Sequence, residues 1–154
     1  IWTREPEQAD LIRRPIMESR VRAFASAAYI RRFGTPKSVT DLDQHRIISY
    51  SGQPAQHLTA VNWIETVGRE SKEPRAAVLR INSVVAIKYA IRAGIGIGMI
   101  PDYMSENETD LVPVLTDIEA PKLPILFAFP EELKNSKKVQ LLRDFLLSKS
   151  RGWK

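Results

Sequence analysis

Asn82 and Ser83 stand at the position in this chain that is best suited to ligand chemistry. They end an apolar–polar alternation over residues 76–82, which predicts a strand, and they precede an amphipathic run from Val84, which predicts a helix. The first backbone N–H groups of a helix have no partner inside it, so with the Ser83 hydroxyl they can hold a carboxylate or another anion. The same residues would also serve as a plain N-cap of their own helix. Spacing alone supports the two interpretations equally.

The chain offers little material for catalysis. Its two histidines, His45 and His57, have no plausible nucleophile beside them in the sequence, and no G-x-S-x-G elbow is present. His45 is expected to close a short helix, and His57 lies in a polar loop. The chain has no cysteine, which excludes disulfides, thiolate metal sites and a cysteine nucleophile. We therefore expect a binding domain rather than an enzyme, with no metal and no cofactor.

Three alternating glycines, Gly94, Gly96 and Gly98, invite a nucleotide-binding interpretation. The dinucleotide fingerprint places its glycines between a strand and a following helix, whereas these follow a helix and enter a strand. A P-loop is excluded because no Gly-Lys-Ser/Thr follows. We expect Gly94 to end the helix in a left-handed conformation, and Gly96 and Gly98 to permit close packing.

Composition describes one ordinary globular domain. The chain has 154 residues, of which 44% are hydrophobic, and this is enough to bury a core without disulfides. Lys and Arg number 23 against 18 Asp and Glu, so the net charge is +5, but no long basic block appears. The densest basic stretch, Arg13 to Arg32, is expected to be solvated rather than to bind nucleic acid. No apolar run approaches the roughly 18 residues of a membrane span, and no signal-peptide pattern opens the chain.

Strand and helix patterns alternate along the chain, which predicts an α/β fold. The strand, helix and strand of residues 76–100 predict a βαβ unit with a parallel pair and a right-handed crossover. Ser26 can N-cap a short helix that Gly34 ends. The other expected strands are 11–16, 21–25, 46–50 and 123–129, and the other expected helices are 38–45, 61–67 and one that opens near Ser136.

Five groups of motifs follow in order along nearly the whole chain: LIRRPI at 11–16, ASAAYI at 25–30 with GTP at 34–36, Asp41-Leu42 with His45, LRIN at 79–82 with AGIGIGMIPDY at 93–103, and LPILFAFP at 123–130 with the stripe from Val139 to Leu146. In this order they resemble the effector domain of LysR-type transcriptional regulators. The departures are Ala27, where the family commonly has proline, and the polar stretch 105–109.

The resemblance implies an architecture like that of type 2 periplasmic binding proteins, with two α/β subdomains joined by crossing strands. Residues 1–17 would form the end of subdomain I and a hinge strand, 18–130 subdomain II, and 131–154 a C-terminal helix that returns to subdomain I. A winged helix-turn-helix domain and the first part of subdomain I would precede Ile1. The incomplete subdomain I would leave an apolar face uncovered, so we expect this chain alone to self-associate.

The resemblance also implies a site for a small-molecule effector between the subdomains. On the subdomain II side its contacts fall at Asn82, Ser83 and Val84, which agrees with the helix-start argument. Arg14 is a second candidate for an effector carboxylate, although an inter-subdomain ion pair is the favoured interpretation. The remaining candidates, at the end of the strand after the helix, are Gly98 and Met99.

The expected protein is therefore a cytoplasmic regulator that senses a small, anionic metabolite, forms dimers or tetramers, binds DNA through the preceding domain and has no membrane contact. Effector binding would change the orientation of the subdomains and re-space the DNA-binding domains. A transport-type solute-binding protein of the same architecture is the alternative. A small-molecule enzyme on a related scaffold is a third possibility.

Overall fold

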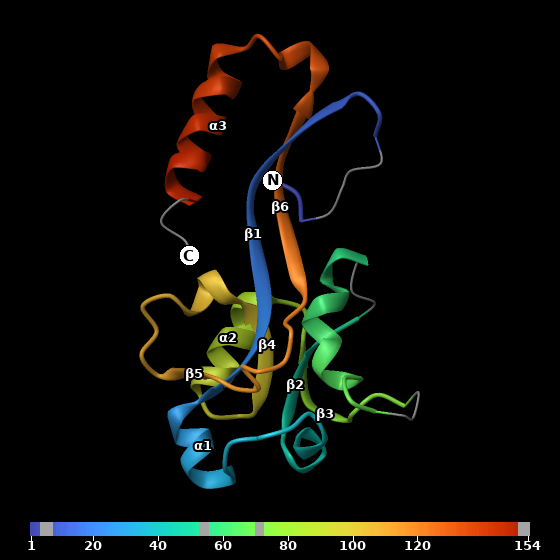
Figure 1. Cartoon of the computed structure of the whole chain (residues 1–154), viewed down its shortest axis with the longest axis vertical. Coiled ribbons are helices and arrows are strands. Elements are labelled where there is room, and N and C mark those ends of the chain that lie inside the picture. The colour runs from blue at the N-terminus through green and yellow to red at the C-terminus, as the bar shows by residue number, and fades with distance from the viewer. Residues whose placement is uncertain (4–7, 53–55, 70–72, 151–154) are drawn as a thin grey trace. The chain divides into compact units, whose positions relative to one another are not determined.

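A computed structural model describes residues 1–3, 8–52, 56–69 and 73–150, with only the backbone of residues 56–60 (Figure 1). The chain divides into two compact units. Unit 1 comprises Ile1–Ser19 and Lys122–Lys154, and unit 2 comprises Arg20–Pro121. The division expected from the sequence kept residues 122–130 in the second subdomain, whereas the structure places them in unit 1.

Unit 1 contains the first part of strand β1 (Leu11–Ser26), strand β6 (Lys122–Pro130), a 3₁₀ turn η4 (Glu131–Leu133) and helix α3 (Lys137–Ser150). The two strands pair with each other, and Trp2 makes an isolated bridge to Leu126. The sequence predicted two separate strands over 11–16 and 21–25, but β1 is one continuous strand. β1 pairs with β6 and also with β4 and β5, so one strand belongs to both units.

Unit 2 is built on a mixed sheet with the order β3-β2-β4-β1-β5. Its strands are β2 (Ile47–Tyr50), β3 (Ala77–Ile81), β4 (Ile97–Pro101), β5 (Leu111–Pro113) and the second part of β1. Strand β2 runs parallel to β3 and β4, and β1 runs antiparallel to β4 and β5.

The expected βαβ unit needs one correction. β3 and β4 are parallel to the same strand, but they do not pair with each other because β2 lies between them. Ile47 and Ile48 of β2 are only 1% and 0% exposed, as expected for a strand with neighbours on both sides. A strand of only four residues, Ile-Ile-Ser-Tyr, carries no signal that tells a central strand from an edge strand.

Helix α2 (Val84–Arg92) covers one face of this sheet and follows the predicted periodicity. Ile87 and Ile91 are fully buried against β4. A Cβ added at Gly98 would lie 3.1 Å from both of these side chains, and one at Gly96 would meet the carbonyl oxygen of Arg46. Gly94 follows the helix with φ 74°. The structure therefore confirms that these glycines serve packing and helix termination.

Shorter helical segments complete unit 2. Helix α1 (Ala27–Phe33) begins and ends as predicted: the Ser26 Oγ accepts a hydrogen bond from the Tyr29 N–H at 3.1 Å, and Gly34 has φ 82°. The segments expected at 38–45 and 61–67 are 3₁₀ helices, η1 (Thr40–Gln44) and η2 (Gln56–Glu65), and a third, η3 (Asp102–Ser105), follows β4. The tighter i→i+3 pattern is common in short runs such as η1 and η3, and η2 is longer than usual for it.

One buried guanidinium ties these segments together. Arg75 is 3% exposed, and its Nε donates to Asp43 Oδ1 at 2.6 Å. Its two terminal nitrogens donate to the carbonyl oxygens of Ile64, Val67 and Val39 at 3.1, 2.7 and 2.9 Å. Arg75 thus connects the start of η1 with the C-terminal end of η2, where carbonyl groups lack partners inside the helix.

Replacing Arg75 with methionine should destabilise unit 2 strongly. The substitution leaves three carbonyl oxygens without their donors, and each orphaned buried group costs about 1–3 kcal/mol, so we expect a loss of about 3 kcal/mol or more in the free energy of unfolding. Urea denaturation monitored by circular dichroism measures this loss.

Arg69→Met is the matched control, because Arg69 pairs with the same Asp43 carboxylate at 3.5 Å but is 26% exposed. The free energy of unfolding of this variant should fall by less than about 1 kcal/mol. Equal losses in the two variants would show that the Arg75 hydrogen bonds do not carry the stability of this region.

Candidate functional site

The N-terminus of α2 has the geometry of a capped helix. Ser83 is extended, with φ −142° and ψ 121°, and its Oγ accepts a hydrogen bond from the Ala86 N–H at 3.3 Å. Asn82 is exposed immediately before it, and Val84 is half-buried. Ser83 therefore acts as the N-cap. Its hydroxyl hydrogen, the Asn82 amide and the first N–H groups of α2 remain available to an anion.

The end of β2 lies beside this helix start. Tyr50 pairs with Ile81 in the parallel ladder, and the Ser51 N–H donates to the Ile81 carbonyl at 2.9 Å. Ser51 and Asn82 thus follow neighbouring strand ends on one edge of the unit 2 sheet. Sequence reasoning missed Ser51, because only the pairing of β2 with β3 brings it there.

Asn62 holds this strand end from its other side. Its Oδ1 accepts from the Tyr50 N–H at 2.8 Å, and its Nδ2 donates to the Tyr50 carbonyl at 3.2 Å. The pairing of β2 with β4 is recorded only at Ile47 and Ile48, so the Asn62 amide takes the place of a strand neighbour at Tyr50. No local sequence signal identifies a side chain that performs this role.

The same edge continues to the end of β4 and the beginning of β1 in unit 2. Asp102 accepts from the Arg20 and Tyr103 N–H groups at 3.3 and 2.9 Å, and its other oxygen lies 3.8 Å from Arg22 Nε. Burial, and next the neighbouring Asp102 charge, raise the pKa of the Tyr103 hydroxyl. This end of the edge is therefore occupied by a structural carboxylate.

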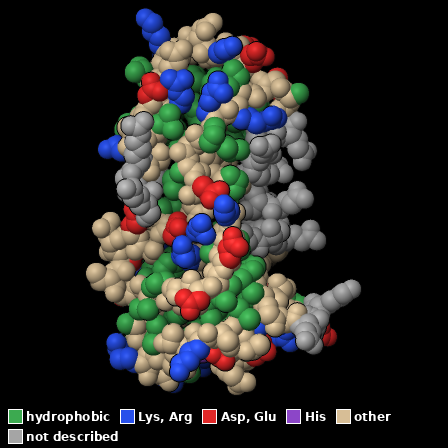
Figure 2. All heavy atoms as spheres, viewed as in Figure 1, with side chains coloured by type: hydrophobic (Ala, Val, Ile, Leu, Met, Phe, Trp, Pro, Cys, Tyr) green, Lys and Arg blue, Asp and Glu red, His purple; other side chains and the backbone are tan. Residues whose placement is uncertain are grey.

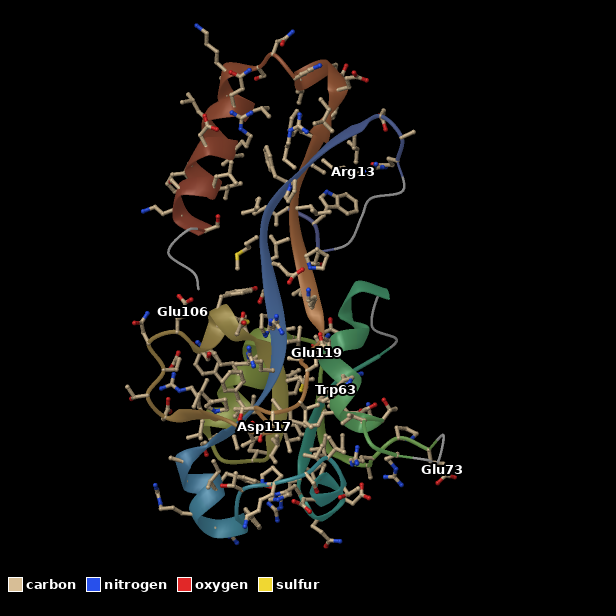
Figure 3. The ribbon with its side chains drawn as sticks, in the orientation of Figure 1. Arg13, Trp63, Glu73, Glu106, Asp117 and Glu119 are labelled. Atoms are coloured by element: carbon tan, nitrogen blue, oxygen red, sulfur yellow. The ribbon has the colours of Figure 1, made fainter. Side chains whose placement is uncertain are left out.

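Gly98 and Met99 lie in the interior of unit 2, and the structure does not bring them to Asn82. Neighbours on a strand point to opposite faces, so Gly98 faces α2 whereas Met99 faces η2. Met99 is fully buried and, with Trp63 of η2 and the segment that carries Asp117 and Glu119, borders a cavity of about 10 Å³ (Figure 3). Such a cavity has room for about one water molecule.

Arg14 belongs to the part of β1 in unit 1, whereas Asn82, Ser83 and Val84 belong to unit 2. Its side chain is exposed, and within the described residues it makes no ion pair or hydrogen bond. It is therefore available to a ligand or to an ion-pair partner, which are the two roles that the sequence left open.

His45 follows the C-terminal end of η1, close to where the sequence placed it. Its Nδ1 lies 3.1 Å from the Tyr29 hydroxyl, and that hydroxyl oxygen also accepts from the Arg46 N–H at 2.9 Å. The Tyr29 hydroxyl and Nδ1 thus share one hydrogen bond, and the tautomer of His45 sets which of the two donates. Burial lowers the pKa of His45 below 6.5, and the Asp41 charge opposes this in part. His57 lies among residues whose side chains are not described.

Among the residues that the structure describes, no three His, Asp or Glu side chains are grouped as metal ligands. In the same ranges, no helix is long and apolar enough to cross a membrane.

Comparison with known proteins adds independent observations. The model of the LysR substrate binding domain family matches residues 1–151. The uncharacterized HTH-type transcriptional regulator YhjC of Escherichia coli (strain K12) is 27% identical over 147 residues, covering 88% of this chain and 46% of YhjC. The chain thus spans about half the length of this curated relative.

Two regulatory domains of known structure share the fold. The domain of CrgA, a LysR-type transcriptional regulator from Neisseria meningitidis, superposes with a TM-score of 0.77 at 21% identity, covering 96% of this chain and 72% of that one. The CcmR regulatory domain of Synechocystis PCC6803, solved in complex with 2-PG, gives a TM-score of 0.70 at 18% identity. The match covers 96% of this chain and 71% of the CcmR chain.

The His45 contact predicts how stability depends on pH. Because the folded state holds His45 with a pKa below 6.5, the unfolded chain binds more protons just below that pH. The free energy of unfolding should be highest above pH 6.5, fall as the pH decreases through 6.5, and level off below the folded-state pKa. His45→Gln should flatten this dependence between about pH 7.5 and 5.5.

Chemical denaturation at several pH values measures the effect, with His57→Gln as the control for the other histidine. A decline in His45→Gln as steep as in the unmodified chain would contradict the assignment.

Proposed function

The chain belongs to the LysR substrate binding domain family, and on this premise we propose that it senses a small anionic metabolite for a DNA-binding regulator. The observation that carries the proposal is the exposed start of α2, where Asn82 and the capped Ser83 follow β3. The helix dipole adds partial positive charge at this end, which favours a carboxylate or a phosphate. The match to an HTH-type regulator favours a sensor over a transport-type binding protein.

We assign the contacts on unit 2 to Asn82, Ser83 and Val84. The Asn82 amide and the Ser83 hydroxyl are neutral donors, and the Val84 N–H adds a backbone donor at the helix start. The side chain of Val84 is apolar and half-buried, so it would contact the carbon frame of the ligand. Arg14 of β1 would supply a guanidinium for bidentate recognition of a carboxylate. Gly98 and Met99 would support the site from the interior without direct contact.

The proposed mechanism is a change in the orientation of the two units. A ligand shifts an equilibrium only by its differential affinity for the two states, so contacts from both units are required. In the whole regulator, which we propose to be cytoplasmic and dimeric or tetrameric, this shift would re-space DNA-binding domains that lie outside this chain. The CcmR domain solved with 2-PG supports the proposal, because it is a domain of the same fold with a small ligand bound. Neither a catalytic group nor a cofactor enters the mechanism.

Substitution of the N-cap separates ligand binding from helix stability. Ser83→Asp retains an N-cap acceptor but places a negative charge where the anion would lie. We expect at least about tenfold weaker binding of anions, equivalent to about 1.4 kcal/mol, with little change in the melting temperature. Titration of inorganic phosphate, acetate and 2-PG, followed by the NMR shifts of the Asn82, Ser83 and Val84 amides, measures this binding.

Ser83→Asn is the matched control, since asparagine caps as well as aspartate but carries no charge. It should bind the same anions within a few-fold of the unmodified chain. If Ser83→Asp binds them as tightly as the unmodified chain does, the site does not lie at the start of α2.

A further inference from the structure

Two exposed guanidinium groups stack on one phenyl ring at the α1 end of unit 2. The Cζ atoms of Arg32 and Arg46 each lie 5.1 Å from the centroid of the Phe33 ring. These three residues are all exposed, and we call them the α1 cationic stack. Arg46 directly precedes β2, whereas Asn82 lies beside the end of that strand, about 13 Å away at the usual rise per residue. The α1 cationic stack is thus a different surface from the proposed effector site.

In the part of the chain that the structure describes, the charges of the stack have no ion-pair partner, unlike most other positive charges of this unit. Five arginines of unit 2 form ion pairs with carboxylates, namely Arg22, Arg69, Arg75, Arg80 and Arg92. Within the ranges that the structure describes, the side chains of Arg32, Arg46 and the adjacent Arg31 make no ion pair or hydrogen bond. Lys and Arg side chains are visible at the α1 end of the unit (Figure 2). The positive charge here is therefore open to a partner.

The stack is held in place from beneath. The Phe33 ring rests on Tyr29, with ring centroids 4.7 Å apart, and Tyr29 is 1% exposed. The Tyr29 hydroxyl accepts from the Arg46 N–H at 2.9 Å, which ties the start of β2 to α1. Gly34 ends α1 directly after Phe33, and its N–H donates to the Ile30 carbonyl at 2.8 Å. Because the ring and the backbone beneath the stack are already fixed, less conformational entropy is lost when a partner binds.

We propose that the α1 cationic stack docks an acidic segment of a partner protein. A guanidinium stacked on a ring keeps its N–H groups directed outward along its edge, where they match a carboxylate in a bidentate manner. Since both Cζ atoms lie 5.1 Å from one centroid, they are at most about 10 Å apart. Carboxylates two residues apart on an extended peptide lie about 7 Å apart, within reach of both groups. The Phe33 ring, 36% exposed, adds an apolar contact between them.

Duplex DNA fits this surface less well. Tight binding to DNA neutralises many phosphates, typically 6 to 10, along a continuous basic stripe. The stack and Arg31 together supply three cations. A short acidic peptide needs only the stack itself.

The test measures fluorescence anisotropy of a labelled hexaglutamate peptide, and of a labelled 20-base-pair duplex, with this chain. The double variant Arg32→Gln/Arg46→Gln should bind the peptide at least about tenfold more weakly. The control Arg80→Gln/Arg92→Gln removes the same net charge from paired arginines and should change binding less than about twofold. Arg32→Lys/Arg46→Lys keeps the charge but loses the planar fork, so it should give an intermediate loss.

Three results would overturn the proposal. The first is no binding of hexaglutamate by the unmodified chain at low salt. The second is an equal loss in the two glutamine double variants, which would show that net charge alone attracts the peptide. The third is tighter binding of the duplex than of the peptide with the same dependence on Arg32 and Arg46, which would assign the surface to DNA.

Discussion

The packing around β4 depends on the absence of side chains at Gly98, within the strand, and at Gly96, directly before it. At Gly98 the helix approaches so closely that a methyl group would press on Ile87 and Ile91, and at Gly96 a methyl group would meet the Arg46 carbonyl. The first contact fixes the helix over the strand, and therefore fixes where its N-terminus and Ser83 lie. The second fixes the start of β2, from which Arg46 extends. The segment from Gly96 to Gly98 thus positions both surfaces to which we assign binding.

The opposite face of the sheet is held by polar contacts. Arg75 donates hydrogen bonds to carbonyl groups at η1 and η2, and the Asn62 amide bonds to Tyr50 where a neighbouring strand otherwise would. Both side chains are buried or half-buried and bond to backbone atoms, Arg75 also to Asp43, so they hold segments that lack regular hydrogen bonding of their own. Through Asn62 this support reaches the end of β2 beside Asn82. A rigid site at this edge therefore depends on η2 as much as on α2.

The sequence predicts those parts of the structure that depend on neighbouring residues. Periodicity and capping identify α2, and the same local signals place Ser83 at its N-cap and Gly94 at its end. The insertion of β2 between β3 and β4 depends on contacts distant in the chain, so neither the strand order nor Ser51 follows from local pattern. Gly98 and Met99 illustrate the same limit: their place in the chain suggested the edge, but burial of the strand that carries them puts both inside.

The ion pairs decide which positive charges of this chain can attract an anionic partner. Its net charge of +5 suggests attraction to anions, and the basic stretch from Arg13 to Arg32 contains the densest cluster. In the structure, however, Arg22 faces Asp102 and serves the sheet edge, whereas Arg32 stacks on Phe33 and makes no ion pair within the described residues. Paired charges are largely compensated at short range, so long-range attraction comes from the unpaired ones. Among the described residues of unit 2, Arg32 and Arg46 at the start of β2 therefore contribute positive charge that no carboxylate offsets.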